Sequence, residues 1–259
     1  MQLSGRRIIV TGGARGIGAA SVRAFVAEGA NVASLDVLDD AGRQVAGEAT
    51  EKGPGTAQYR HCDVTDRQQV NAAFTEVVRE LGGLDVLANI AGVEGSARAA
   101  DITDEEWDRI FAVNVKGTLY TNQAAYRAMR GNEVGGRIIN VGSDAGLGPN
   151  PNGGHYSASK GAVMSWTRTA AAEWGGDNIT VNALLPAMWT PMYEEFRSRM
   201  RPENLAAHDA AMAARVPLGG RLGDPDRDLG PVMVFLASDG SRFITGQLIS
   251  VNGGLGSVR

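Results

Sequence analysis

Short apolar runs alternate with longer amphipathic segments along almost the whole chain. Segments with a helical period of apolar residues predict helices over 16–29, 39–52, 66–81, 103–131, 155–175 and 224–238. Asp66 and Thr103 stand where the N-caps of two of these helices are expected. The runs of aliphatic and β-branched residues between the helices predict strands at 7–12, 31–37, 57–64, 84–92, 136–143, 179–186 and 247–253. Regular alternation of strand and helix predicts an α/β fold, a doubly wound parallel sheet of seven strands with helices on both faces.

One segment, 187–223, does not fit this alternation. No repeat, charge block or linker divides the 259 residues, so we expect a single domain over 1–259. A connection as long as 187–223 is uncommon in a compact domain and is often functional, so the pattern predicts a substrate lid there. Its apolar side chains fit two interpretations, a substrate pocket or packing of the lid on the core: Met188, Trp189, Met192, Tyr193 and Phe196.

Composition excludes several classes of function. Hydrophobic residues make up 43% and charged residues 21%, which argues against disorder, and the net charge of −4 gives no electrostatic reason to expect a nucleic-acid partner. The single cysteine, Cys62, excludes an internal disulfide and suits a reducing compartment. No apolar run approaches the ~18 residues of a membrane span. We therefore expect a cytoplasmic protein with no membrane partner, and the spacing of His61, His155 and His208 predicts no metal site.

The stretch VTGGARGIGAA follows the first predicted strand and opens the first predicted helix. Gly12, Gly16 and Gly18 let the backbone turn sharply and approach a phosphate, and free N–H groups at the helix start attract the anion. Arg15 and Ile17 lie within the same loop. A tight strand–helix turn would also explain the glycines, but the flanking strand and helix favour a dinucleotide site.

Asp36 ends the second predicted strand, 20 residues beyond Gly16. This is the distance expected for a carboxylate that accepts hydrogen bonds from ribose hydroxyls. Its charge would repel a 2′-phosphate and so favours NAD over NADP, although Arg15 could help to bind such a phosphate. We expect the carboxylate to decide the preference, and NAD to be the cofactor.

The stretch YSASK places Tyr156 and Lys160 one helical turn apart, on one face of a helix. A neighbouring ammonium group favours the ionised phenol, so we expect Lys160 to lower the pKa of Tyr156. A phenol with a lowered pKa can exchange protons near neutral pH, which makes the pair a candidate for acid–base catalysis.

Taken together, these motifs resemble the short-chain dehydrogenase/reductase family in its short single-domain form, which implies a Rossmann fold. The resemblance covers nearly the whole chain, in the family's order. Thr11–Gly18 match its cofactor loop, and residues 89–92 (NIAG) match the motif at the end of its fourth strand. The positions that the resemblance adds to the cofactor site are Asp63, Val64, Asn89, Ala91, Gly92, Pro186 and Thr190, beside Tyr156 and Lys160.

The resemblance also implies a catalytic tetrad: Asn114, Ser143, Tyr156 and Lys160. Tyr156 would pass a proton to or from the substrate oxygen while hydride moves to or from the nicotinamide. Lys160 would hold the nicotinamide ribose, Ser143 would hydrogen-bond the substrate oxygen, and Asn114 would support a water that relays protons to Lys160. The implied activity is NAD-dependent interconversion of a secondary alcohol and its ketone, and the implied assembly is a homotetramer.

The sequence departs from the family pattern after the sixth predicted strand, and two functions other than alcohol oxidation are compatible with its motifs. Ala187 replaces a usual glycine, and Thr190 comes one residue early for a contact with the nicotinamide carboxamide. Arg197, Arg199 and Arg201 could receive an anionic substrate or form a solvated helix face. If these arginines bind an anionic substrate, the activity would be that of a 3-oxoacyl-thioester reductase that uses NADPH. A non-catalytic dinucleotide-binding scaffold would not need the positioned serine and tyrosine.

Overall fold

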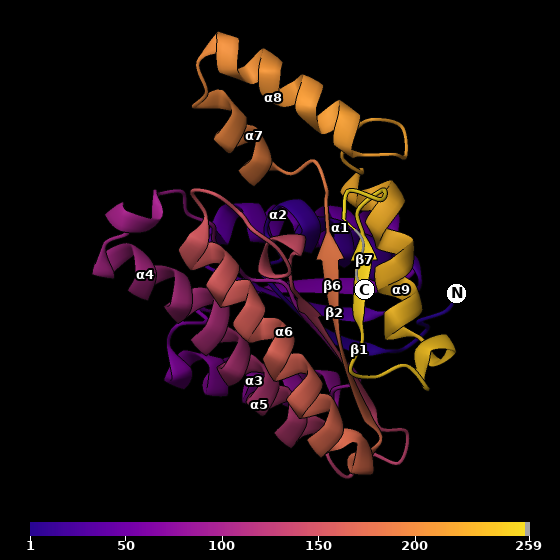
Figure 1. Ribbon diagram of the computed structural model, residues 1–259. Coiled ribbons are helices and arrows are strands. Elements are labelled where there is room, and N and C mark those ends of the chain that lie inside the picture. The colour runs from indigo at the N-terminus through magenta and orange to yellow at the C-terminus, as the bar shows by residue number, and fades with distance from the viewer. Residues whose placement is uncertain (257–259) are drawn as a thin grey trace.

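The computed structural model describes residues 1–256 of the chain, so the last three residues of the expected domain lie outside this account. Within that range the sheet has seven parallel strands in the order β3-β2-β1-β4-β5-β6-β7 (Figure 1). The strands are β1 (Arg7–Thr11), β2 (Asn31–Asp36), β3 (Thr56–His61), β4 (Val86–Asn89), β5 (Gly136–Val141), β6 (Ile179–Pro186) and β7 (Leu248–Val251). The order reverses between β1 and β4, and crevices at such reversals bind ligands in open α/β sheets. The predicted fold class is confirmed.

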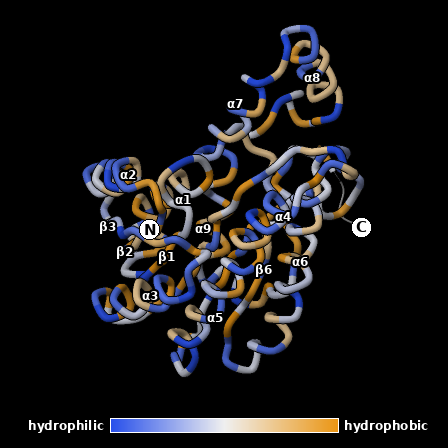
Figure 2. The backbone as a smooth tube through the Cα atoms, turned by 90° about the vertical axis from the view of Figure 1, so that its left-hand side faces the viewer, coloured by the Kyte–Doolittle hydropathy of each residue, from blue (hydrophilic) through white to orange (hydrophobic). Residues whose placement is uncertain are grey.

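Helices cover both faces of the sheet. One apolar cluster joins the strands to the helices α3 (Arg67–Leu81), α5 (Thr118–Met129) and α6 (Gly154–Trp174). A second cluster on the other face involves α1 (Gly16–Ala27), α2 (Asp39–Lys52) and α9 (Gly230–Ala237). Figure 2 shows hydrophobic positions gathered along the strands and on the sides of the helices that face them. Burial on both faces explains why the central strands read as continuous apolar runs.

The helix predicted over 103–131 is interrupted in the structure. It consists of α4 (Asp104–Phe111), a π-helical turn η2 (Ala112–Gly117) and α5. Thr103 caps α4 as predicted, because its hydroxyl accepts a hydrogen bond from the backbone N–H of Glu106. The helical spacing of apolar residues continues through this π-helical turn, so the sequence pattern does not reveal the turn. Asn114 lies within it. π-bulges of this kind occur frequently at functional sites.

Several predicted elements have different ends in the structure; β4, for example, spans only Val86–Asn89 of the predicted strand 84–92. The last predicted helix starts with a π-helical turn, η5 (Pro225–Leu229), before α9. The third predicted strand ends at His61 rather than at residue 64, because Asp63 and Thr65 form a turn in which the Asp63 carboxylate accepts the N–H of Thr65 at 2.8 Å. This turn leads to α3, whose predicted N-cap Asp66 accepts hydrogen bonds from the N–H groups of Gln68 and Gln69.

The segment 187–223 forms two helices, α7 (Pro191–Ser198) and α8 (Pro202–Arg215), beyond the carboxyl ends of the strands (Figure 1). Arg197 of α7 pairs with Asp209 of α8, and the Tyr193 hydroxyl lies 2.8 Å from His208 Nε2. The two helices therefore hold each other through polar contacts between their side chains. We refer to residues 187–223 as the lid segment.

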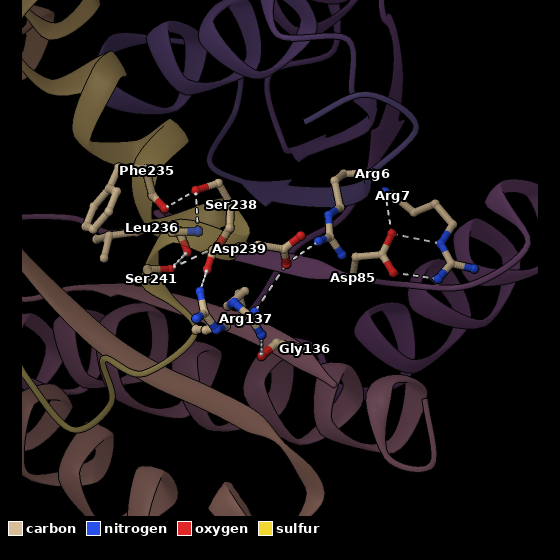
Figure 3. Close-up of polar contacts among 12 residues, drawn as sticks. Arg6, Arg7, Asp85, Gly136, Arg137, Phe235, Leu236, Ser238, Asp239 and Ser241 are labelled. Carbon is tan, nitrogen blue, oxygen red and sulfur yellow. Dashed lines mark hydrogen bonds and ion pairs between the residues drawn. The ribbon is translucent and has the colours of Figure 1, made fainter. Parts of the chain in front are cut away.

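The opposite, amino ends of the strands are held by arginine–aspartate pairs (Figure 3). Asp85 accepts hydrogen bonds from the backbone N–H of Arg7 at 2.8 Å and from its guanidinium at 2.9 and 2.5 Å. Asp239 accepts one from Arg6 at 2.5 Å and lies 3.5 Å from the nearly buried guanidinium of Arg137. These contacts tie β1 to the start of β4 and to the turn after α9, far from the cavity described below.

Asp85→Asn is expected to destabilise the protein by about 2–4 kcal/mol, because it leaves a partly buried guanidinium without its charged partner. Hydrogen bonds and charge from Arg7 hold the pKa of Asp85 below its ordinary value against the opposing effect of burial. A carboxyl group with a lowered folded pKa stabilises the fold above its unfolded pKa of about 4, and this stabilisation is lost as pH falls through the folded value. Urea unfolding from pH 7 down to pH 3 should therefore show a difference between wild type and variant that shrinks with acidity. A difference that stays constant over this range would contradict the assignment.

Candidate active site

The glycine loop between β1 and α1 has the backbone conformation that its glycines allow. Gly12 and Gly16 have φ values of +69° and +55°, in the left-handed region that favours glycine. A Cβ at Gly18 would lie 1.9 Å from the carbonyl oxygen of Gly12, so Gly18 permits the helix to start directly against the turn. Gly12 and Gly16 line the cavity described below, whereas Gly18 lies behind them.

Asp36 closes β2 beside this loop. Its carboxylate accepts hydrogen bonds from three backbone N–H groups, those of Ala14 at 3.0 Å, Val37 at 2.8 Å and Leu38 at 3.1 Å. The side chain therefore fixes the glycine loop to the end of β2 and presents a negative charge at the rim of the cavity. Arg15 points toward the lid segment instead, where its guanidinium lies 3.3 Å from Glu195.

At the end of β4 the motif residues divide into two groups. Ala91 and Gly92 line the cavity, but the Asn89 side chain turns into the protein and is 4% exposed. It donates to Thr118 at 3.0 Å and accepts from Thr121 at 2.8 Å. Asn89 thus supports the backbone beneath the cavity through its hydrogen bonds to the threonines of α5.

Ser143, Tyr156 and Lys160 meet at the carboxyl end of β5 and the first turns of α6. The Ser143 side chain lies close enough to Tyr156 to affect its pKa, and Lys160 Nζ lies 5.8 Å from the centre of the Tyr156 ring. Lys160 is 5% exposed and donates to the carbonyl of Val141 at 2.8 Å. The helical spacing read from the sequence thus places the phenol and the ammonium group on the same wall of the cavity.

Asn114 lies behind this wall, in the π-helical turn. Its amide oxygen accepts the N–H of Val93, and its amide nitrogen donates to the Val93 carbonyl, both at 2.9 Å. The same nitrogen donates to Ser159 at 3.0 Å. Gly92, Asn114 and Lys160 lie close together, since a Cβ added to Gly92 would be 3.3 Å from Asn114 Oδ1 and 3.5 Å from Lys160 Nζ. Asn114 therefore connects the end of β4 to α6 without lining the cavity.

The Tyr156–Lys160 pair is buried, which changes the pKa of both groups. Burial raises the pKa of Tyr156 to about 12, although the neighbouring Ser143 hydroxyl lowers it and the charge of Glu94 raises it further. Burial lowers the pKa of Lys160 to about 8. In the protein without its cofactor, burial dominates the pKa of Tyr156, and the Lys160 ammonium group points at the Val141 carbonyl; the expected lowering by Lys160 beside bound NAD stays a prediction. A raised pKa keeps the phenol protonated at neutral pH.

A cavity of about 520 Å³ joins these features. The predicted residues that line it are Gly12, Arg15, Gly16, Ile17, Asp36, Asp63, Val64, Ala91, Gly92, Ser143, Tyr156, Lys160, Pro186 and Thr190. The predicted residues outside its lining are Gly18, Asn89 and Asn114, each of which packs directly beneath it. The predicted site residues thus form one continuous structure around a single concave surface.

The lid segment forms one wall of the cavity. Met188, Met192 and Tyr193 line it, which favours the pocket interpretation for these three, whereas Trp189 and Phe196 are not part of the lining. The Thr190 hydroxyl caps α7 by accepting the N–H of Tyr193 at 3.2 Å. Arg197 stacks on Trp189 and pairs with Asp209, and Arg201 pairs with Glu203 at 3.5 Å. Two of the three clustered arginines therefore already have carboxylate partners.

Glu94 is a cavity residue that the sequence reading did not identify. Its signal was its place two residues after Gly92, just past the motif at the end of β4. Across residues 1–256 no group of histidines, cysteines and carboxylates could hold a metal ion. None of the helices over that range is long and apolar enough to cross a membrane.

Comparisons with known proteins match this site and fold. A family model described as enoyl-(acyl carrier protein) reductase matches residues 12–256. A 3-oxoacyl-[acyl-carrier-protein] reductase from Thermotoga maritima is 38% identical over 256 residues, 98% of this chain and 99% of that protein. A sorbitol dehydrogenase from Cereibacter sphaeroides is 37% identical over 261 residues, covering 98% of each.

Solved structures agree with these relatives. Levodione reductase superposes with a TM-score of 0.91 at 29% identity, over 97% of this chain and 98% of that one. An NAD⁺-bound xylitol dehydrogenase superposes with a TM-score of 0.90 at 31% identity, over 98% of this chain and all of the other. The glycine loop, the strand order and the relatives together lead to one conclusion. This chain belongs to the short-chain dehydrogenase/reductase family, whose members are NAD(P)-dependent oxidoreductases acting on CH–OH groups.

Proposed function

We propose that this protein is an NAD-dependent oxidoreductase that interconverts a secondary alcohol and its ketone. One observation carries the proposal: Ser143 and Tyr156 line the same cavity as the glycine loop and Asp36. A dinucleotide held by the glycine loop and Asp36 would extend along this cavity toward the tyrosine. Bound NAD would supply the hydride acceptor or donor.

Each residue then has a chemical task. The Tyr156 hydroxyl, protonated at neutral pH, donates its proton to a ketone oxygen during reduction and accepts one during alcohol oxidation. Ser143 lines the cavity beside Tyr156 and would stabilise charge that develops on the substrate oxygen. Lys160 and Asn114 hold the wall on which these groups lie, and Lys160 would bind the nicotinamide ribose.

Two side chains favour NAD over NADP. The Asp36 carboxylate lies at the rim where the adenosine ribose would lie, and a negative charge there opposes a 2′-phosphate. Arg15, the residue that could compensate, lies against Glu195 of the lid segment. An NADP phosphate would have to compete with this contact as well as with Asp36.

Asp36→Asn is expected to reduce the preference for NAD over NADP, measured as the ratio of the two kcat/KM values, by about tenfold, the effect of about 1.4 kcal/mol. Asparagine keeps one acceptor oxygen for the backbone N–H groups of Val37 and Leu38, which both bond the same carboxylate oxygen, and loses the acceptor for the N–H of Ala14. Asp40→Asn, on the exposed surface of α2, serves as the matched control and should leave the ratio unchanged. An unchanged ratio in Asp36→Asn would remove the basis for assigning NAD.

The reaction itself is tested by the absorbance of the reduced cofactor, with NAD⁺ and a panel of secondary alcohols or NADH and the matching ketones. Turnover of at least one alcohol–ketone pair with NAD, and weaker turnover with NADP, is the expected result. Cofactor binding without turnover of any pair would support the scaffold hypothesis instead.

A 3-oxoacyl-thioester reductase is the second candidate, favoured by the name of the Thermotoga relative. The lid arginines give it little support, since Arg197 and Arg201 are paired within the lid segment. Turnover of an acetoacetyl thioester with NADPH above that of any simple ketone with NADH would favour it. The homotetramer implied by the resemblance stays a prediction.

A further inference from the structure

The Glu94 carboxylate is an unpaired acceptor on the wall of the catalytic cavity. It is exposed and lines the same cavity as Ser143 and Tyr156. Among residues 1–256, no donor hydrogen-bonds this carboxylate and no cation lies within salt-bridge distance of it. Although the side chain is solvent-accessible, partial desolvation by the surrounding walls raises the pKa of Glu94; at longer range the charge of Arg199 lowers this pKa and the charge of Glu195 raises it.

The backbone around Glu94 is fixed on both sides. Val93, one residue before it, exchanges two hydrogen bonds with the amide of Asn114. The carbonyl of Glu94 accepts a hydrogen bond from Arg109 at 3.1 Å. Gly95, one residue after it, packs against the fully buried ring of His155, which directly precedes Tyr156. The backbone at Glu94 is therefore held in a defined place, and the carboxylate is close enough to Tyr156 for its charge to raise the pKa of the phenol.

The part of the cavity wall formed by the lid segment is largely apolar. The lid segment and the C-terminal region contribute apolar side chains to the cavity, namely Met188, Met192, Met212, Leu222 and Leu255. The hydroxyl of Tyr193 is already engaged with His208. A substrate that lies at Ser143 and Tyr156 and against the lid segment therefore meets these apolar side chains together with the unpaired carboxylate of Glu94.

We propose that Glu94 selects substrates that carry a second hydroxyl group, which donates a hydrogen bond to this carboxylate while the reacting carbinol lies at Ser143 and Tyr156. The preferred substrate class is a neutral diol or hydroxyketone on an apolar skeleton. Such a hydroxyl satisfies a carboxylate that is otherwise left unpaired when substrate excludes water, whereas a simple alcohol leaves it unsatisfied. This inference rests on the proposed alcohol oxidation and adds the identity of the group that recognises the substrate.

The test compares cyclohexanol with 1,2-, 1,3- and 1,4-cyclohexanediol, which place a second hydroxyl at different distances on one skeleton. In wild type, kcat/KM for the best diol is expected to exceed that for cyclohexanol by about tenfold or more, as for a hydrogen bond to a charged group. Glu94→Leu, which keeps the bulk and removes the acceptor, should bring this ratio to within about twofold of one by loss of diol activity, while oxidation of cyclohexanol is retained or increased. Glu94→Gln should fall between the two.

The controls separate this inference from the proposed function. Glu51→Gln, on α2 and outside the cavity lining, should keep the wild-type ratio. Equal use of cyclohexanol and all three diols by wild type, or an unchanged ratio in Glu94→Leu, overturns the role of Glu94 and leaves alcohol oxidation standing. Failure of wild type to oxidise any alcohol or diol overturns both. Loss of both activities in Glu94→Leu, with NADH binding intact, would show that Glu94 acts on the reaction centre rather than on selection, and would also overturn the proposal.

Discussion

Tyr156→Phe is expected to lower kcat by about 10²–10⁴-fold, the usual contribution of a positioned general acid or base. The substitution removes only the hydroxyl and keeps the ring that packs at the start of α6. NADH binding, followed by fluorescence titration, should change little, because the glycine loop and Asp36 lie elsewhere in the cavity. Tyr120→Phe is the matched control, since Tyr120 packs against the core beneath Arg67 and is not part of the cavity lining. Retention of more than a third of the wild-type kcat would show that the phenol does not transfer the proton.

The pH dependence of the wild type follows from the same group. Burial raises the pKa of Tyr156 to about 12, so the phenol stays protonated through the neutral range. Ketone reduction uses the protonated form and should vary little between pH 6 and 8, whereas alcohol oxidation uses the ionised form and should rise with pH. Tyr156→Phe should remove this difference between the two directions along with the activity.

Gly18→Ala is expected to destabilise the protein and to weaken NADH binding together. The added Cβ would lie 1.9 Å from the carbonyl oxygen and 2.6 Å from the carbonyl carbon of Gly12, and backbone atoms cannot rotate away as side chains do. Relief of such overlap typically costs about 1–3 kcal/mol, and in a domain of this size each kcal/mol lowers Tm by roughly 2–4 °C. The shift of the glycine loop should also raise the Kd for NADH by about 100-fold, the effect of about 2.7 kcal/mol of lost binding.

Gly47→Ala provides the opposite expectation within the same protein. Gly47 lies inside α2, and a Cβ there would meet nothing within 4 Å. Alanine should stabilise the helix by about 0.5–1 kcal/mol and leave NADH binding unchanged. Thermal unfolding and fluorescence titration of both variants give the comparison. Equal behaviour of Gly18→Ala and Gly47→Ala would mean that the close approach at Gly18 has no role in the loop.

The apolar pattern predicted the strands and the main helices because burial on both faces of a parallel sheet leaves continuous apolar runs at fixed intervals. The interruption at 112–117 escaped it, since a π-helical turn adds one residue to a helix without changing which residues are apolar. The glycine loop and Tyr156–Lys160 could be read directly, because the loop needs particular residue types at local spacing and the pair needs one helical turn.

The sequence by itself thus determined the fold class, the family and which local groups could carry out the chemistry, since all of these depend on short-range spacing and on the period of apolar residues. Tertiary structure alone decided that Asn89 turns inward to the threonines of α5, that Arg15 meets Glu195, and that Glu94 lies unpaired on the wall of the cavity. It also decided that burial raises the pKa of Tyr156. The physical reason is that desolvation and hydrogen bonding depend on atoms from β4, β5, α6 and the lid segment, which come together only when the chain has folded.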